Sequence, residues 1–158
     1  MNSTPKPLKR NPSLQPLSRE HHDGLMLCFK IRQAIAAGAD PEKITTFIHW
    51  FSREHLEPHF AAEEKYLLPL LAADDHLSAR TLEEHSVLRS YFKRPLLTTE
   101  ELSHFAALLD DHIRFEERIL FQALQSSVSE EELLKALSHE KFEEACVNWQ
   151  DERWLERN

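Results

Sequence analysis

Glycine is nearly absent from this 158-residue chain, which contains only Gly24 and Gly38. Glycine is the usual residue of tight hairpin turns and of loops that wrap phosphates, so its scarcity argues against β-rich and nucleotide-binding folds. Leucine, glutamate, lysine, arginine and alanine dominate instead, and these residues favour helix. We therefore expect an all-α chain, long enough for one domain with a real hydrophobic core.

Long apolar runs, cysteines and excess positive charge are missing as well. No stretch approaches the roughly 20 apolar residues of a membrane-spanning helix, and the polar, proline-rich start has no signal-peptide core. Cys28 and Cys146 are too few for a disulfide framework or a zinc knuckle. The net charge of −8 disfavours nucleic acid, whose phosphates attract basic surfaces. We expect a cytoplasmic protein that binds neither nucleic acid nor membrane.

Prolines and capping residues divide the chain into a lead-in and five helices. Residues 1–16 hold four prolines and are predicted to be extended. The expected helices span residues 18–37, 41–73, 78–93, 98–125 and 129–137. Four amphipathic helices with short connections predict an up-down-up-down four-helix bundle over residues 17–125. Residues 126–158 are predicted to form a C-terminal helical extension that packs on this bundle.

Local signals set the expected helix boundaries. Ser18 and Ser78 are predicted to cap the first and third helices, and Thr98 with Glu101 forms a capping box for the fourth. Pro58 falls inside the second helix, where it removes one backbone donor. That helix is therefore expected either to kink or to consist of two pieces.

A repeated motif on the second and fourth expected helices carries the chemistry. Both copies read His-Φ-x-x-Glu-Glu-x-x-Leu-Φ-x-x-Leu, where Φ is an apolar residue. The four-residue spacing places His59 over Glu63, and His112 over Glu116, on one helix face. That face is otherwise apolar, and a buried carboxylate without a partner is costly there. A bound cation would remove this cost.

The other two helices each add a histidine. His21 aligns with the apolar face of the first helix and is preferred over its neighbour His22, which is rotated by about 100°. His85 has a comparable position on the third helix, and His55, one turn before His59, is a further candidate. The main candidate metal ligands are His21, His59, Glu63, His85, His112 and Glu116.

The donor types restrict the metal. Imidazole and carboxylate together suit iron, manganese or zinc and exclude the thiolate sites of structural zinc. Glu64 and Glu117 lie about 100° off the ligand face and are expected either to face solvent or to hold the histidines. Ferritin-like proteins, the main rival among carboxylate-rich bundles, use two Glu-x-x-His motifs, and only Glu101 with His104 has a comparable spacing here.

These motifs resemble the hemerythrin-like, or HHE cation-binding, family. The likeness rests on the segment Leu17-Ser-Arg-Glu-His21, the two His-x-x-x-Glu-Glu segments and Glu84-His85, in the family's order. The resemblance implies two non-haem iron ions, bridged by Glu63 and Glu116, with the four histidines as terminal ligands. It also implies a protein that binds or senses a small diatomic ligand, dioxygen or nitric oxide, or iron itself.

The chain departs from the oxygen-carrying members at two positions. Those members place two histidines four residues apart on the third helix, whereas Arg89 stands four residues after His85 here. They also use an aspartate five residues after the histidine of the fourth helix, whereas Glu116 follows His112 by four residues here. Arg89 either leaves an iron position open or pairs with a glutamate near the site. An open position favours the alternative function, a di-iron enzyme acting on nitric oxide, peroxide or ferrous iron. Pairing of two copies as a homodimer is left open.

Overall fold

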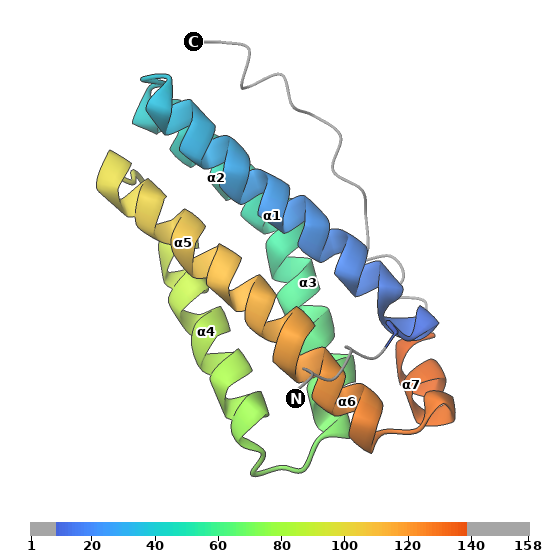
Figure 1. The fold of residues 1–158 in the computed structure, drawn as a ribbon. Helices are drawn as coiled ribbons and strands as arrows, with labels where there is room; N and C mark the ends of the chain where they lie inside the picture. The colour runs from blue at the N-terminus through green and yellow to red at the C-terminus, as the bar shows by residue number, and fades with distance from the viewer. Residues whose placement is uncertain (1–8, 139–158) are drawn as a thin grey trace, which may run out of the picture.

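The computed structural model describes residues 9–138, and every regular element in that part of the chain is helical (Figure 1). The α-helices are α1 (Gln15–Ala36), α2 (Pro41–Phe51), α3 (Glu57–Ala62), α4 (His76–Phe92), α5 (Thr99–Phe115), α6 (Phe121–Ser127) and α7 (Glu130–Leu137). Shorter turns are the 3-10 turns η1 (Pro12–Leu14) and η4 (Leu68–Leu70), and the π-helical turns η2 (Ser52–Leu56), η3 (Glu63–Leu67) and η5 (Glu116–Leu120). The all-α prediction is confirmed. Within residues 9–138, no helix combines the length and apolar character that a membrane span requires.

α1 begins earlier than the sequence predicts. Helical structure covers residues 12–16, which were expected to be extended, and α1 itself starts at Gln15. Ser18 is therefore not a cap: it lies inside α1, and its hydroxyl donates a hydrogen bond of 2.9 Å to Glu117. The predicted stop at Gly38 is confirmed. Its φ of 77° lies in the left-handed region, which glycine adopts without steric cost.

The second predicted helix is a continuous path of helical turns from residue 41 to residue 70, three residues shorter than expected. Pro58 lies near the start of α3 and interrupts the α-helical pattern without ending it. The turn before it is π-helical, and the N–H of Glu57 donates to the carbonyl of Ser52, five residues back. The wider π-turn lets the helical path continue past Pro58, although proline has no backbone N–H to donate.

The caps of the later helices follow the prediction in part. Asp75, not Ser78, caps α4: its side chain accepts a hydrogen bond of 2.8 Å from the N–H two residues on, while Ser78 lies inside the helix. The capping box before α5 is confirmed, because Thr98 and Glu101 exchange two hydrogen bonds of 3.1 Å. Ser129 caps α7 as expected.

The two remaining π-turns begin at the two glutamates of the repeated motif. η3 starts at Glu63 and η5 at Glu116, and each glutamate carbonyl accepts from the N–H five residues later. Single π-turns inside helices are frequent at functional sites. The repeated sequence therefore has a repeated backbone, centred on its buried carboxylates.

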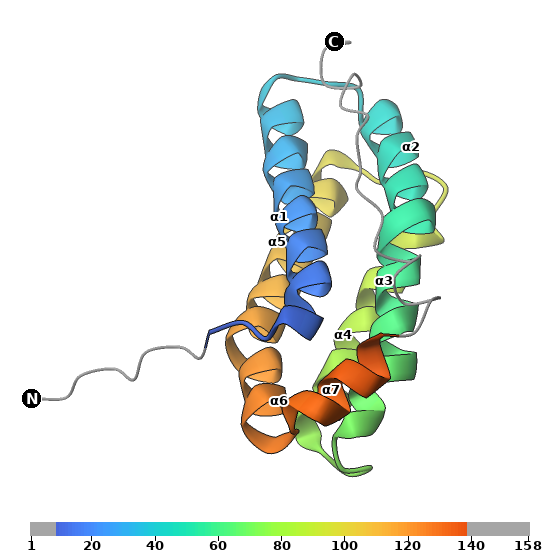
Figure 2. The ribbon, with the colours of Figure 1, turned by 90° about the vertical axis from the view of Figure 1, so that its right-hand side faces the viewer.

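A polar layer divides the interior. α1 and α5 lie side by side along the molecule, with the α2–α3 segment and α4 beside them (Figures 1 and 2). Buried apolar side chains form two clusters. Along α1, Leu27 belongs to one cluster and Leu17 to the other, with His21 between them. α7 covers the second cluster with Leu133 and Leu137. The predicted packing of residues beyond 138 falls outside the described part of the chain.

Candidate metal centre

The structure brings all six main candidates together in the polar layer. Each of them is at most 4% exposed. They come from four different helical segments: His21 from α1, His59 and Glu63 from α3 and η3, His85 from α4, and His112 and Glu116 from α5 and η5. Residues almost one hundred positions apart in the sequence therefore meet in one buried site.

The six residues form two groups of four donors. The first group joins His21 and His59 to one oxygen of each glutamate, at nitrogen–oxygen distances of 2.8, 3.4, 3.8 and 3.9 Å. The second group joins His85 and His112 to the other two oxygens, at 3.2, 3.3 and 3.7 Å. Glu63 and Glu116 thus each give one oxygen to each group.

These distances suit a metal ion. Donors bound at about 2.1 Å from one ion lie roughly 3.0–3.4 Å from one another in octahedral or tetrahedral geometry. Within each group, all four donor atoms lie within 4.8 Å of one another. Each group can therefore close around a cation with small side-chain movements.

Several donor atoms are buried without a hydrogen bond. They are both carboxylate oxygens of Glu63, Oε2 of Glu116, and Nε2 of His85 and of His112. Buried polar atoms nearly always have a partner, and leaving one without a partner costs free energy. All five atoms belong to the two donor groups, so cations bound there would satisfy them.

The second nitrogen of each histidine is held from another helix. Each Nδ1 makes a hydrogen bond with a glutamate: His21 with Glu117 at 2.7 Å, His59 with Glu20 at 3.1 Å, His85 with Glu64 at 2.7 Å, and His112 with Glu84 at 2.8 Å. A carboxylate in this position fixes the tautomer and orientation of the ring and leaves Nε2 free to bind a metal.

The sequence predicted a role for only two of these four glutamates. Glu64 and Glu117 hold histidines, which decides between the two roles expected for them. Glu20 and Glu84 were not predicted, although a signal exists: each directly precedes a histidine, so the dipeptide Glu-His occurs at corresponding positions of α1 and α4. The internal repeat therefore extends beyond the His-x-x-x-Glu-Glu motif.

The charges of the cluster depend on one another. Burial lowers the pKa of His21 and His85, but hydrogen bonds and ion pairs with the glutamates outweigh burial and raise both values to about 10. Burial and the neighbouring Glu116 raise the pKa of Glu63, but His59 and His21 lower it to about 2. Without a metal, protons on the histidines therefore supply the positive charge that the two carboxylates require. Metal ions would displace those protons.

Arg89 pairs with two glutamates, which agrees with the second of the two alternatives expected for it. Its guanidinium donates to Glu57 at 2.8 Å and to Glu64 at 2.7 Å, and lies 5.6 Å above the ring of Phe60. Glu64 in turn holds His85. Arg89 thus acts on the second donor group through Glu64.

We expect Arg89→Met to speed the loss of metal to a chelator, on the order of tenfold, because carboxylates that hold metal-binding histidines affect affinity by that factor or more. The change would leave Glu64 without its charged partner. Arg32→Met is the matched control, since Arg32 pairs with Asp110 at the exposed side of α1. Equal release rates in both variants would show that Arg89 has no influence on the site.

The two secondary candidates lie outside both donor groups. His22 is exposed on α1 and belongs to neither donor group. His55 is buried in η2 but contributes to neither group. Its ring packs 4.9 Å from Phe51 and 5.3 Å from Trp50, measured between ring centres.

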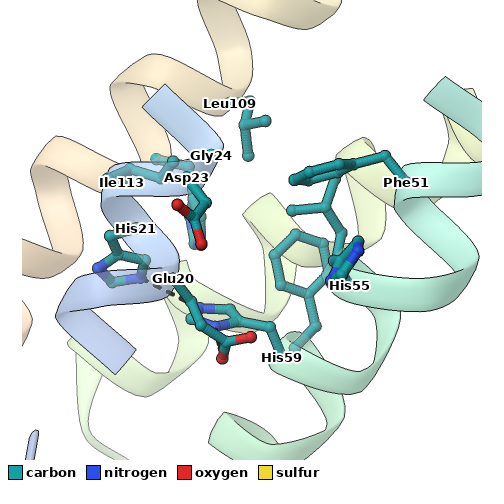
Figure 3. A pocket seen from close by; sticks show the side chains of 12 residues that line it. Glu20, His21, Asp23, Gly24, Phe51, His55, His59, Leu109 and Ile113 are labelled. Carbon is teal, nitrogen blue, oxygen red and sulfur yellow. Dashed lines mark hydrogen bonds and ion pairs between the residues drawn. The ribbon is translucent and has the colours of Figure 1, made fainter. Parts of the chain in front are cut away.

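A small cavity of about 20 Å³ lies beside the first donor group (Figure 3). Three candidate ligand histidines, three other polar residues and six largely apolar ones line it: His21, His59, His112, Glu20, Asp23, His55, Gly24, Phe51, Leu56, Phe60, Leu109 and Ile113. Gly24 permits a close approach of α1 to α5, because a Cβ there would lie 2.7 Å from Ile113. The volume accommodates one molecule of about the size of water.

Comparison with known families agrees with this geometry. The model of the hemerythrin HHE cation binding domain matches residues 14–124, well over half of the chain. No curated protein and no solved structure matches significantly. The matched segment contains all six donors and the four glutamates that hold the histidines. The resemblance inferred from the motifs is thereby confirmed, and the chain belongs to the hemerythrin HHE cation-binding domain family.

Proposed function

We propose that this protein holds two non-haem iron ions, bridged by Glu63 and Glu116, and that the centre binds or senses dioxygen or nitric oxide. The observation that carries the proposal is the division of each buried carboxylate between two pairs of histidines. Two bridging carboxylates with terminal imidazoles match the donor set of di-iron centres in helical bundles. Manganese and zinc suit the same donors.

The protein would orient the histidine and glutamate ligands and keep water away from the buried metal site. Bound iron would supply a redox-active centre with coordination positions that the protein leaves free. Four protein donors per ion leave about two of six octahedral positions for other ligands. The cavity beside His21 and His59 borders the first group, and Phe51, Leu109 and Ile113 form an apolar part of its wall.

The bundle arrangement and the location of the protein are part of the proposal. The alternating direction of successive long helices in Figure 1 supports an up-down-up-down four-helix bundle with α7 as an addition. A cytoplasmic location, with no nucleic-acid or membrane partner, stays a prediction from composition and charge.

Metal analysis of protein produced with iron tests the proposal. We expect about two iron ions per chain, because each donor group can hold one cation. His59→Ala and His112→Ala should each lower the iron content, while His104→Ala, an exposed change on α5, should not. Less than about half an equivalent of any transition metal in the unmodified protein would contradict the proposal.

The alternative is a di-iron enzyme that acts on nitric oxide, peroxide or ferrous iron, or a protein that senses iron itself. Each group offers only four protein donors, which supports the enzyme, because a metal with open coordination positions can bind and activate a substrate. Rapid mixing of the reduced protein with dioxygen distinguishes the two functions. A spectral change that reverses on degassing indicates binding, whereas irreversible oxidation with turnover indicates catalysis.

A further inference from the structure

The four glutamates that hold the histidines differ in their own charged partners. In the second donor group, each of the two has an arginine at short distance. Glu64 accepts a hydrogen bond of 2.7 Å from Arg89, and Arg89 is held in turn by Glu57 at 2.8 Å. Glu84 accepts a hydrogen bond of 2.8 Å from Arg80. Each histidine of this group thus ends a chain that runs from arginine through glutamate to imidazole.

The first donor group is built differently. Within residues 9–138, Glu20 has no arginine or lysine at ion-pair distance, and its partner there is His59 at 3.1 Å. Glu117 accepts two hydrogen bonds from the neutral hydroxyl of Ser18, at 2.9 and 3.1 Å. Its contact with Arg10 is longer, at 3.4 Å. Positive charge therefore lies close to both glutamates of the second group, and the first group has less of it.

This difference changes how well each group balances the charge of a bound ion. A carboxylate on Nδ1 passes negative charge to the imidazole and makes it a stronger metal ligand. An arginine bound to the same carboxylate withdraws part of that charge, and its own positive charge repels the ion. The repulsion grows with the charge of the ion. The second group therefore favours a divalent over a trivalent ion more than the first group does.

Of the two arginines, Arg89 should have the larger effect. Its side chain is 26% exposed and that of Arg80 is 51% exposed, so water screens Arg80 more strongly. The guanidinium of Arg89 lies 5.6 Å from the ring centre of Phe60, and this ring stacks on that of His85 at 4.1 Å. Glu57 offsets part of the charge of Arg89 but is itself 46% exposed. Arg89 is thus fixed beside a candidate ligand of the second group.

We propose that Arg80 and Arg89 make the two metal positions unequal: they favour the ferrous state in the second group, while Glu20 favours the ferric state in the first. This inference rests on the proposed di-iron centre. Both arginines act through glutamates and belong to neither donor group. The consequence is a centre whose two ions change oxidation state at different potentials, with a form between them that holds one ferrous and one ferric ion.

Redox titration of the iron-loaded protein tests this inference. We would reduce the protein stepwise without oxygen, using dithionite and redox dyes, and follow the electron paramagnetic resonance of the one-electron-reduced form. The unmodified protein should show two separate potentials, of which the higher belongs to the second group. Arg89→Met should lower this higher potential, changing that equilibrium constant on the order of tenfold, or about 59 mV, and leave the lower potential nearly unchanged. Arg89→Lys keeps the positive charge and should retain most of the separation.

Glu20→Gln changes the first group in the opposite sense. Glutamine keeps an oxygen that can accept the Nδ1 hydrogen of His59 but removes the negative charge. This variant should raise the lower potential, again on the order of tenfold in the equilibrium constant, and leave the higher one nearly unchanged. Arg32→Met is the matched control, because Arg32 pairs with Asp110 on the exposed side of α1 and should shift neither potential.

Iron content separates this inference from the proposed function. Coincident potentials in an iron-loaded unmodified protein would overturn the inference and leave the metal centre standing. A shift of the lower potential in Arg89→Met, or of the higher one in Glu20→Gln, would overturn it too, because the assignment of the two positions would be reversed. If Arg89→Met retains too little iron, Arg80→Met gives the same test with a smaller expected shift, and unchanged potentials there would overturn the inference. An unmodified protein that binds no iron would overturn both proposals together.

Discussion

Glu116→Ala is expected to empty both metal positions at once. One oxygen of Glu116 lies 2.8 Å from Nε2 of His21, and the other lies 3.3 Å from Nε2 of His112. Removal of this side chain therefore takes one donor from each group. Iron content should fall from about two per chain to nearly none, since each ion would keep only three protein donors. The melting temperature should fall with it, because metal bound to the folded state stabilises that state.

A terminal ligand provides the comparison. His85 belongs to the second group alone, so His85→Ala should retain more metal than Glu116→Ala. Because alanine at position 116 also leaves buried histidines without their partner, Glu116→Gln should be tested beside it, with circular dichroism to verify the fold. The glutamine keeps the shape and one oxygen acceptor, but not the negative charge. Full occupancy of both positions in a folded Glu116→Ala protein would show that Glu116 does not bridge.

The metal-free protein is expected to lose stability as the pH rises from about 6.5 toward 10. The pKa of His21 and of His85 is raised from 6.5 to about 10 in the folded state. A group with a raised pKa stabilises the fold fully below its unfolded value and loses that contribution as pH rises through the folded value. Glu63 acts at the other end: its pKa of about 2 makes its contribution full above 4.5 and lost in strong acid.

Iron should remove most of the loss at high pH. A metal replaces the histidine protons, so its binding releases protons and becomes stronger as pH rises. We therefore expect the difference in melting temperature between loaded and metal-free protein to grow between pH 6 and pH 9 by more than about 5 °C. Calorimetry under anaerobic conditions at three pH values measures it. A constant difference would show that the buried histidines are not protonated in the metal-free state.

Much of the candidate metal centre could be predicted because it follows from spacing along single helices. His59 with Glu63, and His112 with Glu116, share a face at any packing of the bundle, since four residues are about one helical turn. The apolar surroundings of both pairs already indicated a buried polar site. The pairing of Arg89 with a glutamate was also anticipated, although the sequence left it as one of two alternatives.

Other features could not be predicted from spacing. Glu20 and Glu84 hold histidines of other helices, so their roles depend on how helices pack against one another. The caps at Ser18 and Ser78 were wrong because the chain nearby offers Asp75, and an earlier helical turn, as competing starts. These choices depend on contacts that the local sequence does not contain.

The sequence by itself determined the all-α class, the repeated motif and the choice of the six candidate donors, because helix periodicity converts spacing into a shared face. Only the tertiary structure decided how the donors divide between the two groups. Packing of α1 beside α5, with π-turns starting at Glu63 and Glu116, determines which carboxylate oxygen faces which pair of histidines. It also forms the cavity that His55 lines. Distances between helices depend on the whole core, and no spacing within one helix contains them.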